Sequence, residues 1–324
     1  MNMEKKITIS DIAKKANVSK STVSRYLNGG SVSKTTREKI DELVATYNYQ
    51  PNTFAQSLKS KRNHTVGVIV PRLDSAAQVE MLRGLDSENT DDTFLIVNTY
   101  QDSNRELAEI EKMRTQNVRG LIILTANMTD EIRNTLLESD MPIVVQGQDE
   151  SAFNRVLMND LAAGEAVGAY ARSLNPKRVL LLTIPAEHDW AIGHDRTEGI
   201  KNALSDIDVT TLETDFSITQ SKALAQAAMT DQSFDLIIGA TDRIVVGALQ
   251  AGLESGQQAK YIGFGKSDIS TTVTPNLTSF EYDFFHAGQQ LYRLFNQVCD
   301  DSYKEPQRIV LDGELIERAS TKSS

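Results

Sequence analysis

The sequence holds a single cysteine, Cys299, which excludes an internal disulfide and any zinc or iron–sulfur site built on cysteines. Long hydrophobic runs are also missing, since the apolar stretches at residues 65–71 and 120–126 are far shorter than the roughly 18 residues of a membrane span. The N-terminus has no apolar core of a secretory signal. We therefore expect a cytoplasmic protein with no membrane partner, and the length of 324 residues predicts at least two domains.

Motifs of common enzymes are absent as well. The histidines His64, His188, His194 and His286 are scattered, and the closest pair lacks the i, i+4 spacing of a helical zinc site. The run 263–265 lacks the third glycine of a dinucleotide fingerprint, and neither a phosphate-binding loop nor a Gly-x-Ser-x-Gly elbow occurs. We expect no catalytic residues, no metal and no cofactor.

Charge is divided unevenly along the chain. Residues 1–62 hold 12 Lys or Arg against 5 Asp or Glu, whereas the remaining residues hold 22 against 39. A basic N-terminal segment before an acidic body is typical of a protein that meets a polyanion with one end only. Charge alone is equally compatible with a solvated basic helix face. The sequence motifs are therefore needed to distinguish this alternative from binding to a polyanion.

The basic segment has the pattern of three short helices. Thr8 can cap the first helix, with Asp11 at the third position as an imperfect capping box, and Ser33 can cap the third. Ser19 can cap a second helix whose other face is polar and small. That face holds Lys20, Ser21, Thr22, Ser24, Arg25 and Asn28. Two helices joined by a tight turn predict a helix-turn-helix, whose second helix reads the major groove of double-stranded DNA; a bundle that binds no nucleic acid is the alternative.

Residues 8–28, 32–40 and 49–52 together resemble the head of the LacI/GalR family of bacterial repressors. The resemblance implies that Lys20 and Ser21 choose the operator sequence. It also implies that Arg25 contacts bases or backbone, and that Ser24 and Asn28 anchor phosphates.

The family also has a hinge helix, and the resemblance places it here after Pro51. Asn52 would cap this helix, Ala55 would be its small position, and Leu58 would be its wedge in the minor groove. Such a wedge kinks DNA and requires a paired hinge from a second subunit. The alternative for Leu58 is an ordinary helix residue that packs within its own chain.

From Thr65 onward, short apolar runs alternate with amphipathic helical segments, which predicts α/β architecture with parallel sheets. The pattern occurs twice, so we expect two doubly wound lobes with a cleft between them. Expected strands of the first set lie at 66–70, 94–97, 121–124 and 143–145, and those of the second at 179–182, 209–212, 236–238 and 261–264. Expected helices of the first set lie at 78–87, 104–116 and 130–138. Pieces at 278–280, 286–298 and 309–311 are expected to cross back between the lobes.

The predicted organisation is therefore an all-α helix-turn-helix head at 1–50, a hinge helix and linker at 51–63, and a two-lobed effector-binding and dimerisation domain at 64–324. By resemblance the lobes look like periplasmic sugar-binding proteins and are most similar to repressors of trehalose and sucrose operons. Ligands of open α/β sheets bind beyond the carboxyl ends of strands.

Residues that follow strands are thus the candidates for the effector site. Arg72 offers a planar fork of donors suited to a phosphate or paired hydroxyls. The resemblance makes Arg72 part of a phosphate clamp, but Gln148 replaces the partner arginine and Gln78 replaces a nearby glutamate. Arg72 can alternatively be an ion-pair partner at the domain interface.

The resemblance assigns the remaining contacts to a sugar. Arg196 would grip hydroxyls, Asp242 would accept from a hydroxyl, and Phe216 would stack on a pyranose. Trp190 and Tyr282 can add walls, and Lys266 can serve where many relatives have an aspartate. Two alternatives stay open: Trp190 and Phe216 as plain interlobe packing, and Asp242 as a helix cap.

These features predict a homodimeric repressor of a carbohydrate-utilisation operon, released from operator DNA by a sugar or sugar phosphate such as a disaccharide or its 6-phosphate. The C-terminal tail has no leucine heptad, so a coiled-coil tetramer is not expected. The alternative is a sugar-responsive regulator that acts by corepression or through a protein coregulator.

Overall fold

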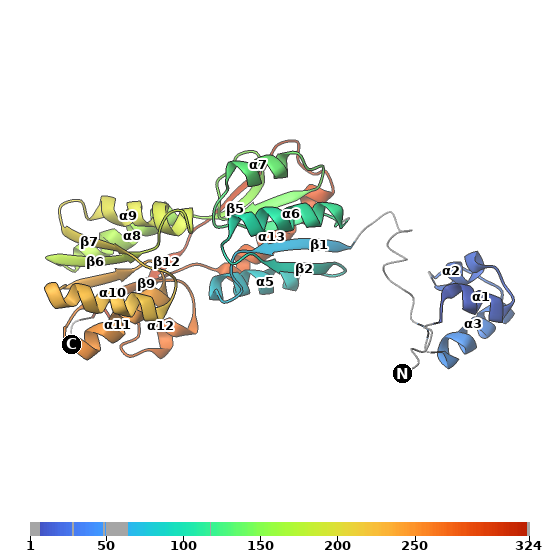
Figure 1. The fold of residues 1–324 in the computed structure, drawn as a ribbon, viewed down its shortest axis with the longest axis horizontal. Coiled ribbons are helices and arrows are strands. Elements are labelled where there is room, and N and C mark those ends of the chain that lie inside the picture. Colours follow the sequence, from blue (N-terminus) through green and yellow to red (C-terminus); the bar gives the residue numbers. More distant parts are fainter. Residues whose placement is uncertain (1–6, 28, 48, 50–63, 117, 323–324) are drawn as a thin grey trace. The chain divides into compact units, whose positions relative to one another are not determined.

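The computed structural model describes residues 7–27, 29–47, 49, 64–116 and 118–322. The chain divides into two compact units between Asn63 and His64. Within the described residues, no helix is long and apolar enough to cross a membrane. Where the N-terminal unit is described, its regular elements are helices, and the larger unit contains two mixed α/β lobes (Figure 1).

The described residues of the N-terminal unit form three helices: α1 (Ile9–Ala16), α2 (Lys20–Leu27) and α3 (Lys34–Thr46). Their small core is formed by Ile12, Ala13, Ala16, Val23 and Ile40, all buried. The predicted three-helix pattern is confirmed, because the apolar positions occur at helical spacing and face one another.

Local caps explain where these helices begin and end. Thr8 and Asp11 form a complete capping box on α1, since each side chain accepts from the backbone N–H of the other. Asn17 ends α1 in the left-handed region with φ 54°, which allows the tight turn into α2. Ser33 accepts from the backbone N–H of Thr36 at the start of α3.

The first lobe contains a six-stranded parallel sheet in the order β11-β5-β4-β3-β1-β2. Its strands are β1 (Thr65–Val70), β2 (Thr93–Asn98), β3 (Leu121–Leu124), β4 (Ile143–Gln146), β5 (Asn154–Met158) and β11 (Arg308–Leu311). Helices α5 (Ala76–Glu88) and α13 (Phe284–Cys299) pack on one face, and α6 (Ser103–Thr115) and α7 (Asp130–Leu137) on the other. Strands β1 and β3 are apolar almost throughout because both faces of the sheet are covered.

The second lobe contains a sheet in the order β12-β10-β9-β8-β6-β7. Its strands are β6 (Arg178–Thr183), β7 (Asp208–Glu213), β8 (Leu236–Gly239), β9 (Lys260–Phe264), β10 (Thr278–Glu281) and β12 (Glu314–Ile316). Its helices are α8 (Asp160–Ser173), α9 (Thr197–Ala203), α10 (Ile218–Asp231), α11 (Asp242–Ser255) and the short α12 (Asp268–Thr272). A π-helix, η1 (Ala191–Arg196), leads directly into α9.

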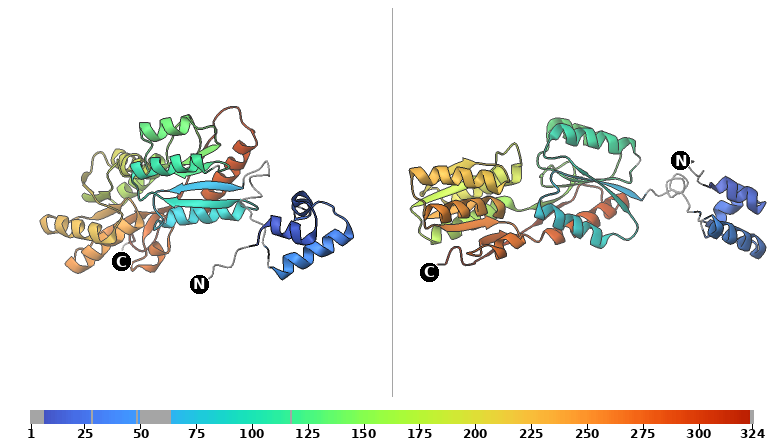
Figure 2. Two further views of the ribbon diagram at one scale, coloured as in Figure 1. Left: turned by 45° about the vertical axis from the view of Figure 1, so that its right-hand side comes forward. Right: turned by 60° about the horizontal axis from the view of Figure 1, so that its bottom comes forward.

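The chain passes between the lobes three times (Figure 2). It crosses from β5 to α8, returns from β10 to α13, and crosses again from β11 to β12. The predicted late crossings are thus confirmed. Elements that the sequence pattern did not reveal include β5, α8 and the terminal β12. Strand β12 pairs antiparallel with β10 and so departs from the all-parallel expectation.

Candidate effector site and nucleic-acid interface

The second helix of the N-terminal unit presents a polar face. Lys20, Ser21 and Arg25 on α2 are exposed. The hydroxyl of Ser21 lies 2.7 Å from that of Ser19. Neither Lys20 nor Arg25 forms an ion pair with another described residue, so α2 presents two cations on its exposed face, which suits a recognition helix.

Two hydroxyl groups at the start of this helix have a structural partner, since those of Ser21 and Thr22 lie 2.7 and 2.8 Å from the hydroxyl of Ser19. Ser19 accepts from the backbone N–H of Thr22 at 3.1 Å and so caps α2. Thr22 and Ser24 are half-buried. Four predicted DNA-contacting residues, Asn28, Asn52, Ala55 and Leu58, lie outside the described residues.

A cavity of about 160 Å³ lies between the two lobes. The first lobe contributes Arg72 after β1, Gln78 on α5 and residues after β3 and β4. The second lobe contributes the start of α8, η1, the start of α11 and the loop after β9. The lining combines charged groups with aromatic rings, which is typical of a small-molecule site.

Arg72 and Phe216 meet across the cleft. The Arg72 guanidinium lies 4.1 Å from the centroid of the Phe216 ring, while its Nε donates to Asp74 at 3.0 Å. The backbone N–H of Arg72 donates to Gln78 at 2.8 Å, so Gln78 holds the loop that carries Arg72. All but Asp74 line the cavity. The ion pair of Arg72 is local to its own loop rather than across the lobes, whereas Phe216 does make a contact between the lobes.

Arg196, at the end of η1, is buried in an ion pair. Its Nε donates to Asp160 Oδ1 at 2.9 Å, a second nitrogen donates to the same oxygen, and a third donates to the carbonyl of Ala240. The guanidinium also lies over the Phe264 ring at 4.5 Å. Asp160 was not anticipated, and it forms this pair from the first turn of α8.

Tyr282 does not line the cavity, contrary to the expectation that it adds a wall. Its ring is buried in the core of the second lobe, and its hydroxyl donates to Asp160 at 3.2 Å. An aromatic residue after a strand can face either the cleft or the core, and here the phenol finds its acceptor behind the site.

Asp242 lines the cavity from the first turn of α11, but it does not cap that helix. Thr241 caps α11 by accepting from the backbone N–H of Ile244. The Asp242 carboxylate accepts instead from the Ser279 hydroxyl at 2.7 Å. Burial raises the pKa of Asp242 to about 6, which keeps part of this group protonated near neutral pH.

Two predicted residues, Trp190 and Gln148, lie off the cavity, whereas Lys266 lines it. Trp190 is 46% exposed, stacks on His194 and does not line the cavity; its backbone N–H donates to Asn127 of the first lobe. Gln148 also lies off the cavity, and its amide donates to the Ala126 carbonyl at 2.7 Å. Lys266 is exposed and lines the cavity.

Two further charged residues in the cleft were missed by the sequence reasoning. Asp189 precedes η1 and accepts from the backbone N–H of Ile192, and burial raises its pKa to about 7. Arg243 follows Asp242 on α11. The position after Thr241 signalled Asp242, but nothing in the pattern separates Arg243 from an ordinary surface arginine. No cluster of metal-ligating residues occurs in the described part of the chain.

A helix-turn-helix head followed by two α/β lobes with a cavity between them defines a DNA-binding regulator that responds to a small molecule. Comparisons with known proteins agree. Residues 8–52 match the bacterial regulatory proteins of the lacI family, and residues 63–289 match the periplasmic binding proteins and sugar binding domain of the LacI family. The chain belongs to the LacI family of bacterial regulatory proteins.

Relatives match over nearly the whole chain. A sucrose operon repressor of Staphylococcus xylosus is 32% identical over 94% of this chain and 98% of its own length. Catabolite control protein A of Priestia megaterium is 29% identical over 98% of this chain and 99% of its own. The crystal structure of the lac repressor dimer bound to operator and the anti-inducer ONPF shares the fold, with a TM-score of 0.88, 22% identity and coverage of 98% and 100%.

Proposed function

We propose that this protein is a dimeric repressor of a carbohydrate-utilisation operon, released from its operator when a sugar binds between the lobes. The observation that carries the proposal is the cavity, which takes its lining from both lobes of a chain that also bears an exposed recognition helix. A ligand held by both lobes favours one lobe arrangement over others, so its binding can change the geometry that the heads need on DNA.

The chemistry of the cavity suits a carbohydrate. Asp242 and the Arg196–Asp160 pair offer acceptors and donors for hydroxyl groups, while Phe216 and Phe264 offer flat apolar surfaces for a ring. Such a site discriminates between ligands. A ligand without matching hydroxyls leaves polar groups of the protein without hydrogen-bond partners, and this lowers its affinity.

The two-fold symmetry of operators is the reason for proposing a dimer. A single recognition helix reads one half-site, and two-fold operators require two heads at a spacing of one helical turn. The lac repressor structure named above, which shares this fold, is a dimer bound to operator, and this supports the same assembly.

The proposal is tested with the full chain and an operator recovered by selection from random duplex DNA. We expect a two-fold symmetric site, and we expect one sugar from a panel of disaccharides and their phosphates to weaken operator binding by about five- to 150-fold. Anisotropy titrations at fixed salt measure both, since salt alone changes affinity. Tighter binding on adding sugar would instead establish corepression.

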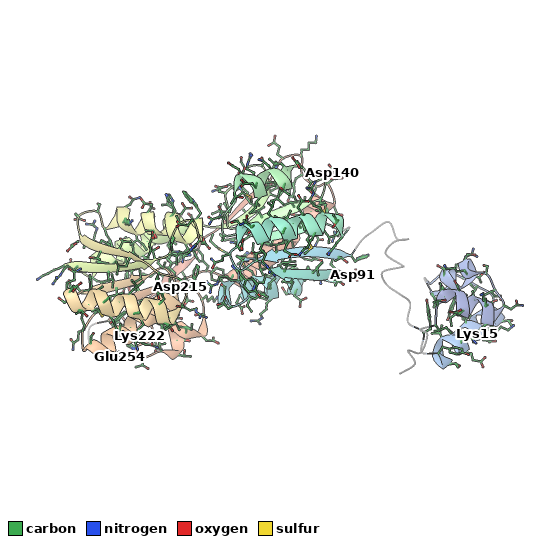
Figure 3. The ribbon with its side chains drawn as sticks, viewed as in Figure 1. Lys15, Asp91, Asp140, Asp215, Lys222 and Glu254 are labelled. Atoms are coloured by element: carbon green, nitrogen blue, oxygen red, sulfur yellow. The ribbon has the colours of Figure 1, made fainter. Side chains whose placement is uncertain are left out.

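A matched control lies away from the cleft. Lys222 on α10 and Glu254 on α11 form an exposed pair at 2.5 Å, and both residues are labelled in Figure 3. Lys222→Ala removes a cation from the second lobe, and Lys222 does not line the cavity. The response of this variant to sugar should therefore equal that of the wild type.

A further inference from the structure

Residues 184–190, the loop between β6 and η1 of the second lobe, are hydrogen-bonded to the first lobe. The Asn127 side-chain amide donates to the carbonyl of Glu187, and its oxygen accepts from the backbone N–H of Trp190 at 3.1 Å. That N–H also donates to the carbonyl of Ala126 at 3.1 Å. The donor and the acceptor of one amide side chain are therefore both used across the boundary between the lobes.

A second amide reaches the same loop from another part of the first lobe. Gln101, which follows β2, donates from Nε2 to the carbonyl of His188 at 3.2 Å. Gln101 and the preceding Tyr100 both have left-handed backbone, with φ of 60° and 58°. This conformation is unfavourable for residues other than glycine, and it persists where surrounding contacts hold it. Here the backbone N–H of Gln101 donates to the carbonyl of Pro71 at 3.0 Å, which holds the turn that presents the amide.

Both amides lie at the edge of the cavity between the lobes rather than in its wall. Neither Asn127 nor Gln101 is among the described residues that line this cavity. Thr125 and Asp189 both line it, and they belong to the two segments that the Asn127 bonds join. The Asn127 amide therefore holds together two segments that face the cavity, without lining the cavity itself.

The 184–190 loop leads directly into η1, which contributes Ala191, Ile192 and Arg196 to the cavity. The first N–H groups of a helix have no partner within the helix. The N–H of Trp190, where η1 begins, finds its partners on the opposite lobe. The Trp190 ring also stacks on His194 of η1, with ring centroids 4.1 Å apart. Separation of the lobes thus breaks bonds at the start of the helix that positions Arg196.

We propose that Asn127 and Gln101 are positioning residues of an interlobe latch, which holds the 184–190 loop against the first lobe before any effector binds. The latch stabilises the lobe arrangement in which both lobes line the cavity. An effector that needs both lobes binds more tightly when that arrangement is more populated. This last consequence rests on the proposed function, whereas the latch itself is a property of the chain without ligand.

The test of the latch uses the full chain without ligand. Trp190 is the single tryptophan of the sequence, so tryptophan fluorescence and its quenching by acrylamide report on this loop alone. Hydrogen exchange of a peptide that covers residues 184–193 gives a second readout. The variants are Asn127→Ala and Gln101→Glu, the second of which keeps the side-chain size but replaces the donor with a carboxylate oxygen. Both substitutions lie in the first lobe, whereas both readouts report on the second.

We expect each variant to speed exchange of the 184–193 peptide by about 3- to 10-fold and to increase quenching of Trp190, because the loop loses bonds to the first lobe. The double variant should show a larger change than either single variant. Gln226→Ala is the matched control. It removes an exposed amide that donates to Glu254 at 2.8 Å within the second lobe, and it should behave as the wild type.

Two results overturn the latch. The first is unchanged exchange and quenching in Asn127→Ala. The second is an equal increase in exchange for peptides from β8, in the core of the second lobe, because the substitution would then destabilise that lobe as a whole.

Operator measurements separate the latch from the proposed function. We expect a sugar that releases operator DNA from the wild type to bind Asn127→Ala about 3- to 10-fold more weakly. If the variants loosen the loop but no sugar of the panel changes operator binding by the wild type, the latch stands and the proposed function fails. If a sugar releases operator DNA from the wild type and from Asn127→Ala with equal affinity, and exchange is unchanged, the proposed function stands and the latch fails.

Discussion

The Arg72 guanidinium of the first lobe lies over the Phe216 ring of the second, 4.1 Å from its centroid. This contact joins the lobes at the wall of the cavity between them, which both residues line. A cation over an aromatic face is worth about 0.5–2 kcal/mol, depending on its exposure to water. Part of the free energy that favours this lobe arrangement therefore exists before any ligand binds.

Phe216→Leu tests this contribution, since it keeps an apolar side chain but removes the ring quadrupole. We expect effector affinity to fall about fivefold, corresponding to roughly 1 kcal/mol, while operator affinity without effector stays within twofold. Calorimetry and anisotropy measure the two values. An unchanged effector affinity would show that the ring only fills space.

Arg196→Ala is expected to destabilise the protein as well as affect the sugar response. The substitution leaves the Asp160 carboxylate buried without its partner, which costs about 3–5 kcal/mol in similar buried pairs. Urea unfolding measures the loss. Arg172→Ala breaks the exposed pair with Asp206 in the same lobe and should cost far less. A small loss for Arg196→Ala would mean that water reaches Asp160.

Stability should depend on pH through Asp242. Its pKa in the folded state, about 6, is above the value of an unfolded aspartate, so the folded protein binds the proton more tightly. This contribution is fully present below the unfolded pKa and disappears as the pH rises through about 6. Between pH 5.5 and 7.5, wild type should lose about 1 kcal/mol of unfolding free energy relative to Asp242→Asn. Parallel pH profiles of the two proteins would contradict the raised pKa.

The exposed Arg25 side chain is expected to form a bidentate hydrogen bond to a base, so Arg25→Ala should weaken operator binding by about 1–3 kcal/mol. The substitution should also relax the sequence preference at one position of each half-site. Lys39→Ala, exposed on α3, is the matched control. Selection from random duplexes with each variant measures the preference. A uniform loss across sequences would identify Arg25 as a phosphate contact.

The sequence predicted the head well because its signals are local. Thr8 and Ser33 mark helix starts through bonds that span three residues, and Asp242 was found because chain topology brings strand ends to one edge. The ion pair between Asp160 and Arg196 spans 36 residues and arises only when α8 and η1 pack together. Patterns of apolar spacing carry no information about such pairs.

The sequence pattern also could not predict whether a given side chain faces the cleft or the core. Tyr282 follows a strand as a cleft wall does, yet its hydroxyl points to a buried carboxylate. Arg243 has the same neighbours in sequence whether or not its guanidinium has a partner. Both outcomes depend on the side chains that surround a position, and these come from distant segments.

The three crossings between the lobes also determine the order in which parts of the chain can fold during synthesis. The first lobe includes α13 and β11, which follow almost the entire second lobe in sequence. A nascent chain that has emerged only as far as β5 lacks α13, one of the two helices on one sheet face, and β11, the strand that completes the edge. The head can therefore fold on the ribosome early, whereas the first lobe must wait for residues 284–311, with its apolar strands exposed to aggregation meanwhile.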